Sequence, residues 1–138
     1  MSLPFSFSET SPETNVVLLV EDEPFIAIDM AETLSAAGYP VETRSSRSDA
    51  TRWLASNSPS VAILDVHLKD GDGTEIALIL QDRGVPIIFC SGGSPADLPA
   101  DFQAAAWVRK PFTEGELLRA IRGALDARDF HQQMEASA

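Results

Sequence analysis

Short apolar segments alternate with longer amphipathic segments along this sequence. Most of the short segments are rich in branched residues and have the length of buried strands; they cover residues 16–20, 41–43, 61–64, 86–90 and 106–109. In the longer segments, apolar residues recur every three or four positions, which predicts helices over 24–37, 48–57, 74–83 and 114–125. Pro24, Gly38 and the pair Thr113 and Glu116 are residue types that begin or end helices.

The region between residues 91 and 105 interrupts this pattern. Pro95, Pro99 and the Gly92-Gly93 pair leave room for only about one or two helical turns, so the fourth helix is expected to be short or irregular. Five strands that alternate strictly with helices predict an α/β fold: a doubly wound, five-stranded parallel sheet of order 2-1-3-4-5, flavodoxin-like. In such a sheet, ligands bind beyond the carboxyl ends of the strands.

The length and composition suit a single domain. With 138 residues, of which 44% are hydrophobic, the chain can bury one ordinary core but not a second domain of typical size. We expect that domain over residues 15–128. Residues 1–14 and 129–138 lack apolar periodicity and are expected to be flexible ends.

Charge and apolar runs restrict the possible partners. A formal net charge of -11 opposes binding to nucleic acid or to an anionic membrane, because both depend on basic patches. The sequence has neither a signal segment nor a run of about 18 apolar residues, which predicts a soluble, cytoplasmic protein. Cys90, inside the apolar run PIIFC, is interpreted as a core residue without a redox role.

Candidate chemistry gathers where the predicted strands end. Glu21 and Asp22 follow the first strand, Asp65 the third, Ser91 the fourth and Lys110 the fifth. Because neighbouring strands lie about 5 Å apart, three carboxylates at one sheet edge would repel each other unless positive charge lies between them. Lys110 and a divalent cation would neutralise them, and the small set of hard oxygen ligands suits Mg²⁺.

Asp65 is the candidate nucleophile of this site. Carboxylates form aspartyl phosphates, and a metal ion spreads the charge that develops during phosphoryl transfer. Ser91 and Lys110 would hold the other phosphoryl oxygens. The acids also have simpler interpretations: Glu21 and Asp22 suit the positive end of a helix, and Asp65 suits a turn at the end of a strand.

Four motifs give a specific resemblance. LLVEDEP, VAILDVHLKDGDG, PIIFCSGG and WVRKPF, in this order and at these intervals, resemble the receiver domains of response regulators, the CheY-like superfamily of two-component systems, over about residues 16–125. The resemblance implies an aspartyl phosphate that a histidine kinase forms on Asp65, and a domain that assists its own phosphorylation and dephosphorylation but is not otherwise an enzyme. It implies Mg²⁺ ligands at Glu21, Asp22, Asp65 and the backbone carbonyl of His67.

The resemblance also implies a conformational switch. Ser91 would be the switch hydroxyl, Trp107 the switch aromatic, and Lys110 the lysine before a cis Pro111. The FCSGG run and the weak fourth helix are similar to the FATGUY group of receivers, which is associated with histidine kinases of the HWE type. Trp107 is larger than the usual Tyr or Phe, and Gly92 replaces the commoner Ala, which should loosen the loop.

Other functions are compatible with parts of the sequence. The run Asp70-Gly71-Asp72-Gly73-Thr74 resembles the nucleophile loop of haloacid-dehalogenase-like phosphatases, although His67-Leu68-Lys69 separates it from the strand. As a receiver, the chain would signal through contacts with a downstream protein. Alternatively, it would be a passive adaptor or phosphate sink for a kinase. Either a monomer or a weak homodimer fits the exposed face of the last helix.

Overall fold

A computed structural model describes residues 16–93, 98, 100–102 and 106–137. Its main sheet has five parallel strands in the order β2-β1-β3-β6-β7, so the predicted fold is confirmed. These strands are β1 (Val17–Val20), β2 (Val41–Arg44), β3 (Val61–Asp65), β6 (Ile87–Ser91) and β7 (Ala106–Arg109). The helices are α2 (Pro24–Ala36), α3 (Arg47–Leu54), α4 (Thr74–Asp82) and α5 (Glu114–Ser137).

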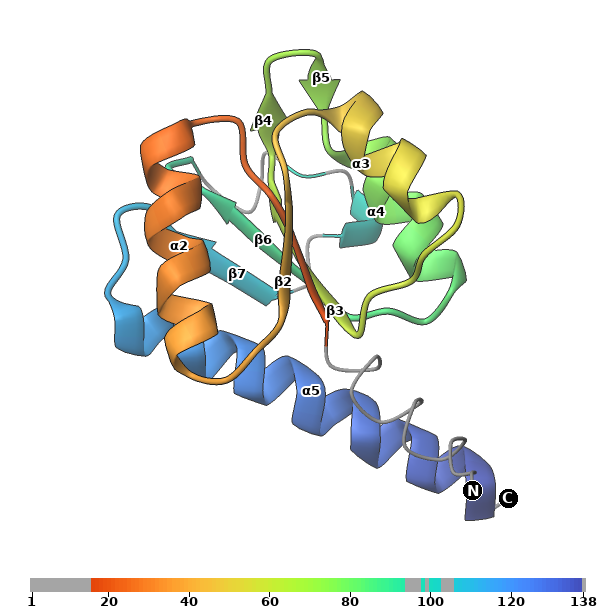
Figure 1. Cartoon of the computed structure of the whole chain (residues 1–138). Helices are drawn as coiled ribbons and strands as arrows, with labels where there is room; N and C mark the ends of the chain where they lie inside the picture. The colour runs from red at the N-terminus through yellow and green to blue at the C-terminus, as the bar shows by residue number, and fades with distance from the viewer. Residues whose placement is uncertain (1–15, 94–97, 99, 103–105, 138) are drawn as a thin grey trace, which may run out of the picture.

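Two layers of helices cover the sheet, α2 and α5 on one face and α3 and α4 on the other (Figure 1). Successive strand residues point to opposite faces, so β1 supplies both cores. Leu18 and Val20 pack with the α3 and α4 side, whereas Val17 and Leu19 pack with the α2 and α5 side. Because both faces are covered, β1 and β3 are buried throughout, which explains why β1 is continuously apolar and why β3 is apolar up to Asp65, its last residue.

The helix ends follow the signals in the sequence. Pro24 lies in the first turn of α2, and Gly38, at a φ of 98°, follows its last turn. At the start of α5, the Thr113 N–H donates to Glu116 Oε1 (2.8 Å), and the Glu116 N–H donates to Thr113 Oγ1 (3.1 Å). This reciprocal pair is the capping box that the sequence predicts.

The segment between β6 and β7, where the sequence predicted a short or irregular helix, is irregular in the part that the structure describes. The 3₁₀ segment η2 (Ala100–Phe102) is the helical element described between β6 and β7. Phe102 is buried and its ring lies against Phe89 of β6, with 5.7 Å between the centroids. The expected short or irregular fourth helix agrees with this part of the chain.

Two features differ from the sequence-based expectation. A small antiparallel hairpin, β4 (His67–Leu68) and β5 (Gly71–Asp72), precedes α4, where the sequence pattern predicted no strand. The helix α5 continues to Ser137, whereas residues 129–138 were expected to be a tail without regular structure. Residues 124–138 contain neither Gly nor Pro and include several good helix formers, so the existing helix can propagate without further core contacts. The expected flexible segment 1–14 lies outside the described residues.

None of the helices in the described part of the chain combines the length and the hydropathy needed to cross a membrane.

Candidate functional site

Four strands of the main sheet deliver polar side chains to the same edge. Glu21 follows β1, Asp65 and Ser91 are the last residues of β3 and β6, and Lys110 follows β7. Parallel pairing in register fixes this meeting point, because β3 lies between β1 and β6, and β7 flanks β6. The backbone N–H of Lys110 also donates to the Ser91 carbonyl (3.0 Å), which joins the ends of β6 and β7.

Three carboxylates converge at this edge. One oxygen each from Glu21, Asp22 and Asp65 lies within 4.8 Å of the other two. Glu21 and Asp65 are buried, with 2% and 6% of their surface exposed, while Asp22 is partly exposed. The sequence-based prediction that these acids gather in one place is therefore confirmed.

Backbone donors orient the two buried carboxylates. The Glu23 N–H donates to Glu21 Oε2 (3.0 Å), and the His67 N–H donates to Asp65 Oδ1 (3.1 Å). Each bond lies within a short loop that follows the strand, so the same local turn that ends the strand also fixes its acid. One oxygen of each carboxylate remains directed toward the shared site.

The ammonium of Lys110 lies between those remaining oxygens. Its Nζ donates to Glu21 Oε1 at 2.7 Å and to Asp65 Oδ2 at 3.4 Å. The pairing joins residues that are 89 and 45 positions apart in the sequence, so only the completed sheet can form it. The Lys110–Pro111 peptide bond is cis, as the resemblance to receivers implies.

The site has more negative than positive charge. Burial raises the pKa of Glu21 and outweighs the opposing hydrogen bond from Lys110. Burial alone would lower the pKa of Lys110, but the hydrogen bond to Glu21 and the field of Asp65 leave it above its usual value. Lys110 is therefore charged at neutral pH, yet one ammonium does not balance three carboxylates. A divalent cation with a preference for oxygen ligands fits this donor set.

Ser91 and His67 lie beside the acids in different ways. Ser91 is buried, and its Oγ accepts a hydrogen bond from the Gly93 N–H (3.1 Å). The His67 side chain is exposed, and the backbone contact of His67 with the site is its N–H to Asp65. Trp107 is half-buried, pairs in register with Phe89 and packs against the core on the α3 and α4 side.

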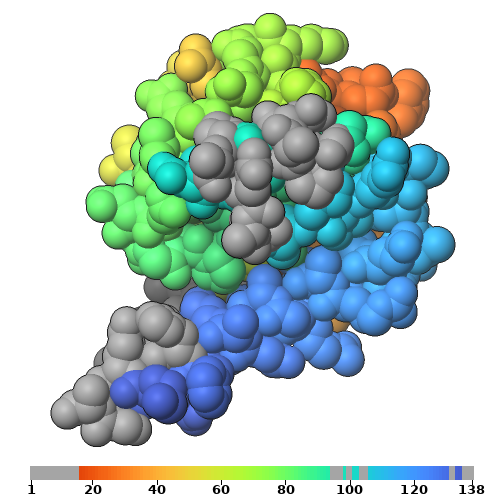
Figure 2. Space-filling view, turned by 180° about the vertical axis from the view of Figure 1, so that it is seen from behind, coloured from red at the N-terminus to blue at the C-terminus, as the bar shows by residue number. Residues whose placement is uncertain are grey.

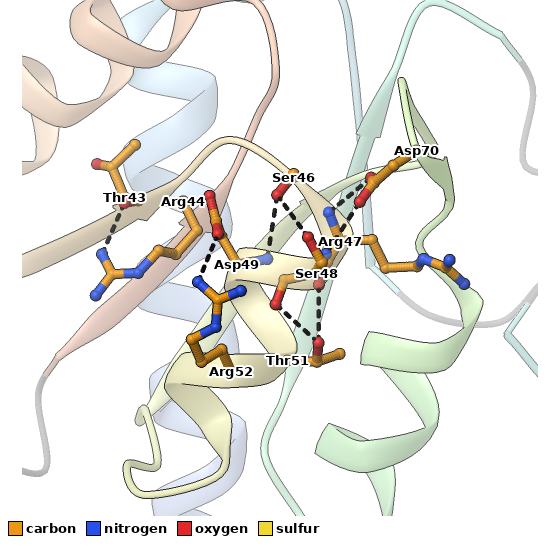
Figure 3. A network of polar contacts seen from close by, with 9 residues as sticks. All are labelled: Thr43, Arg44, Ser46, Arg47, Ser48, Asp49, Thr51, Arg52 and Asp70. Carbon is orange, nitrogen blue, oxygen red and sulfur yellow. Dashed lines mark hydrogen bonds and ion pairs between the residues drawn. The ribbon is translucent and has the colours of Figure 1, made fainter.

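Asp70 has a different position from the acidic site. It lies at the tip of the β4–β5 hairpin, and its two carboxylate oxygens accept the backbone N–H groups of Arg47 (2.8 Å) and Ser48 (3.1 Å) in α3 (Figure 3). These bonds lower the pKa of Asp70. A phosphatase nucleophile would instead follow a strand of the main sheet with a free oxygen, so the geometry disagrees with the phosphatase interpretation. Sequence reasoning missed this contact because the partners are 22 and 23 residues apart.

Cys90 agrees with its interpretation as a core residue. It is 1% exposed, and burial raises the pKa of its thiol to about 12, so the thiolate does not form at neutral pH.

Comparisons with known proteins agree with this geometry. A family model described as "Response regulator receiver domain" matches residues 17–122. The transcriptional regulatory protein PdtaR of Mycobacterium tuberculosis is 34% identical over 110 residues, which cover 76% of this chain and 54% of PdtaR. The C4-dicarboxylate transport transcriptional regulatory protein DctD of Pseudomonas aeruginosa is 30% identical over 119 residues, 81% of this chain and 25% of DctD. The chain thus spans about half of the length of PdtaR and a quarter of the length of DctD.

Solved structures share the fold. A response regulator receiver protein from Sinorhizobium medicae superimposes with a TM-score of 0.74 and 27% identity, covering 86% of this chain and 99% of that one. The signal receiver domain of an HD domain-containing protein from Pseudomonas fluorescens gives a TM-score of 0.77 and 26% identity, covering 88% and 93%.

Proposed function

We propose that this chain, which belongs to the response regulator receiver domain family, accepts a phosphoryl group on Asp65 from the phosphohistidine of a histidine kinase. Members of this family act in two-component signalling as phosphoacceptors rather than as classical enzymes. The observation that supports the proposal is the cluster of Glu21, Asp22 and Asp65, in which Glu21 and Asp65 contact the Lys110 ammonium. In the transfer, the P–N bond to the kinase imidazole breaks and a P–O bond to the Asp65 carboxylate forms.

The acidic cluster is typical of a receiver Mg²⁺ site, and we propose Mg²⁺ as its cofactor. Glu21, Asp22, Asp65 and the His67 carbonyl would hold the ion, and when bound it would neutralise charge on the phosphoryl oxygens. Both oxygens of Glu21 already accept hydrogen bonds, from Glu23 and Lys110. Asp22, the most exposed of the three acids, therefore has the greatest freedom to approach the ion directly.

Lys110 and Ser91 would complete the acceptor site. Lys110 Nζ contacts Asp65 Oδ2, the oxygen that is not held by the His67 N–H, so it lies beside the oxygen free to attack. It would orient that oxygen and then pair with the new phosphate. Ser91, at the end of the adjacent strand β6, would donate its hydroxyl to another phosphoryl oxygen.

An aspartate pair tests the assignment. The chain is incubated with acetyl phosphate or a phosphorylated kinase and Mg²⁺, and intact mass is measured. We expect one added phosphoryl group on the wild type and on Asp70→Asn, and none on Asp65→Asn. An unchanged wild-type mass, or a label that survives in Asp65→Asn, would contradict the proposal. Phosphate release abolished by Asp70→Asn but not by Asp65→Asn would support the phosphatase alternative.

We also propose that phosphorylation changes a surface near Ser91 and Trp107, through which the chain contacts a downstream protein. Trp107 packs beside Phe89 in the core, next to the described 3₁₀ segment η2. This supports the proposal, because a small shift of the Trp107 side chain would alter the surface at that place. Amide exchange with and without phosphorylation would show altered protection at residues 91–93 and 106–110. Unchanged exchange there would favour a passive adaptor or phosphate sink.

The subgroup is a further part of this proposal. Two features support the FATGUY group and a kinase of the HWE type. They are the FCSGG run and the short 3₁₀ segment η2, which is the helical element described between β6 and β7. Phosphotransfer profiling tests this: an HWE-type kinase should label Asp65 faster than kinases of other types do.

A further inference from the structure

The hairpin that carries His67 is too short to hold its own position. Its strands β4 and β5 contribute two residues each, and an isolated two-stranded hairpin is marginally stable at best in water. Figure 2 shows the atoms of this part of the chain (yellow-green) on the outside of the molecule, far from the projecting end of α5 (blue). The position of the His67 backbone, which the proposed Mg²⁺ site uses, therefore depends on contacts outside the hairpin.

Two hydrogen bonds fix the base of the hairpin. The His67 N–H donates to Asp65 Oδ1 (3.1 Å), and the Gly73 N–H donates to the Val66 carbonyl (3.3 Å). Both bonds lie at the end where the hairpin leaves β3 and enters α4. By themselves they would allow the tip, at Asp70, to rotate about that end.

The start of α3 holds the tip. Asp70 Oδ1 accepts the Arg47 N–H (2.8 Å), and Asp70 Oδ2 accepts the Ser48 N–H (3.1 Å), as Figure 3 shows. The first N–H groups of a helix have no acceptor within the helix, so a carboxylate binds well there. Arg47 adds a second contact, because its guanidinium lies over Gly71 and contacts Glu75 of α4 at 3.3 Å. These contacts form the Asp70 junction.

The Asp70 junction joins the two loops that carry the acids. The start of α3 comes shortly after β2, and the carbonyl of Arg44, the last residue of β2, accepts the N–H of Glu21 (3.1 Å). On the other side, the hairpin leads back to Asp65 through His67. Hydrogen bonds and short backbone segments thus connect Glu21 to Asp65 by way of α3 and the hairpin, in addition to the main sheet.

The proposed metal ligands differ in how firmly the fold holds them. Glu21 and Asp65 are buried beside the ends of sheet strands, whereas the His67 carbonyl belongs to the hairpin. Mg²⁺ tolerates little departure from octahedral geometry, and loss of an outer contact that orients a ligand commonly weakens metal binding by about tenfold or more. A hairpin that moves would therefore weaken Mg²⁺ binding even if the three acids stayed in place.

We propose that Asp70 is a positioning residue for the acidic site: by tying the hairpin to α3, it keeps the His67 carbonyl in a fixed position relative to the acids that bind Mg²⁺. Asp70 acts through the hairpin and touches neither the ion nor the phosphoryl group. The inference rests on the proposed Mg²⁺ site, but its first consequence, a fixed hairpin, applies to the metal-free protein as well.

Amide exchange of the full chain in EDTA, followed by NMR, tests the fixed hairpin without metal or phosphodonor. Asp70→Ala should speed exchange of the His67 N–H at least about tenfold relative to the amides of β1, which report global unfolding. Ser46→Ala is the matched control, because Ser46 Oγ accepts the Asp49 N–H (3.1 Å) and caps the same helix without contacting the hairpin. Equal acceleration at His67 in the two variants would overturn the proposal.

A Mg²⁺ titration at neutral pH, followed by the amide signals of the acid-bearing loops, tests the consequence for binding. Asp70→Ala should raise the dissociation constant about tenfold. Asp70→Asn, a milder change that keeps one acceptor oxygen, should raise it by less. Ser46→Ala should leave the dissociation constant unchanged, and so should Asp72→Asn, which removes an equal charge from the same hairpin.

The outcomes distinguish this inference from the proposed function. If the wild type binds no Mg²⁺, the proposed metal site is wrong and the positioning role of Asp70 falls with it. If the wild type binds Mg²⁺ and the two Asp70 variants bind it equally well, only the positioning role is overturned. Equal weakening by Asp72→Asn would attribute the effect to charge and would also overturn the positioning role.

Discussion

The carboxylate of Asp70 joins the β4–β5 hairpin to the first turn of α3 through two backbone N–H donors. The same hairpin begins at His67, whose N–H orients Asp65. Arg47 strengthens the junction, because its guanidinium contacts Glu75 at 3.3 Å and lies over Gly71. A residue distant from the acidic site therefore stabilises the loop that borders it.

Replacement of Asp70 by Asn should destabilise the fold at neutral pH. Asn has one acceptor oxygen, so one of the two N–H donors would face an amide N–H₂ group instead. Since the pKa of Asp70 is lowered in the folded state, its stabilisation is present above the ordinary pKa of about 3.9 and is lost as pH falls through the folded value. Urea denaturation should show a gap between the two proteins at pH 7 that narrows below pH 4.

Asp72→Asn is the matched control for this prediction. The Asp72→Asn substitution removes the same charge from the same hairpin. The contact found for the Asp72 carboxylate is with one backbone N–H, that of Thr74 (3.1 Å), and the side-chain oxygen of Asn can accept the same hydrogen bond. Its unfolding midpoint should stay closer to that of the wild type. If both variants lost equal stability, charge rather than hydrogen-bond geometry would be the cause.

At the scale of elements, the strand and helix pattern predicted the sheet, its order and the acidic edge. The acids could be placed because each follows directly after a predicted strand, and parallel strands end at one edge. The hairpin could not be predicted, since its two-residue strands are too short for a periodic signal. The extension of α5 was missed because apolar periodicity indicates a helix face that is buried. The part of α5 that projects past the sheet has no such buried face, so its sequence lacks the periodic signal.

Two glycines, one just after α2 and one inside α5, should respond to alanine in opposite ways. Gly38, after α2, has a φ of 98°, and no atom lies within 4 Å of the position that a Cβ would occupy. Gly38→Ala should therefore lower the free energy of unfolding by about 1 kcal/mol through backbone strain alone. Gly123, inside α5, is equally open but helical, so Gly123→Ala should stabilise the fold by about 0.5 to 1 kcal/mol. Denaturant unfolding at low protein concentration measures the change in the free energy of unfolding for both variants. Changes of the same sign would contradict the explanation.

At the scale of the whole molecule, two cores hold the strand ends rigidly around charges that repel one another. Burial of the main-sheet strands prevents Glu21 and Asp65 from moving apart, so the fold itself maintains an unfavourable electrostatic arrangement. Because the pKa of Glu21 is raised by burial, the folded state binds a proton more readily than the unfolded state does. Without a metal ion, this group therefore lowers stability as pH rises above its ordinary value of 4.5.

Mg²⁺ should reverse that loss and stabilise the entire domain. The ion binds the folded cluster and not the dispersed acids of the unfolded chain, so a concentration 100 times its dissociation constant should add about 2.7 kcal/mol. Thermal unfolding should show a higher Tm with Mg²⁺ than with EDTA at pH 7, and a smaller difference near pH 5, where protons compete for Glu21. Lys110 remains charged across this range because its pKa is raised, so it does not produce the change.

Two aspartates seven residues apart, Asp22 and Asp29, separate specific binding of Mg²⁺ from general screening of a negatively charged protein. Asp22→Asn removes an acid of the cluster and should abolish most of the Mg²⁺-dependent rise in Tm. Asp29→Asn removes an equal charge from the exposed side of α2, outside the cluster, and should keep the rise. A rise that persisted in Asp22→Asn, or that equal ionic strength of NaCl reproduced, would show that Mg²⁺ acts by screening the net charge of -11 and not by binding at the strand ends.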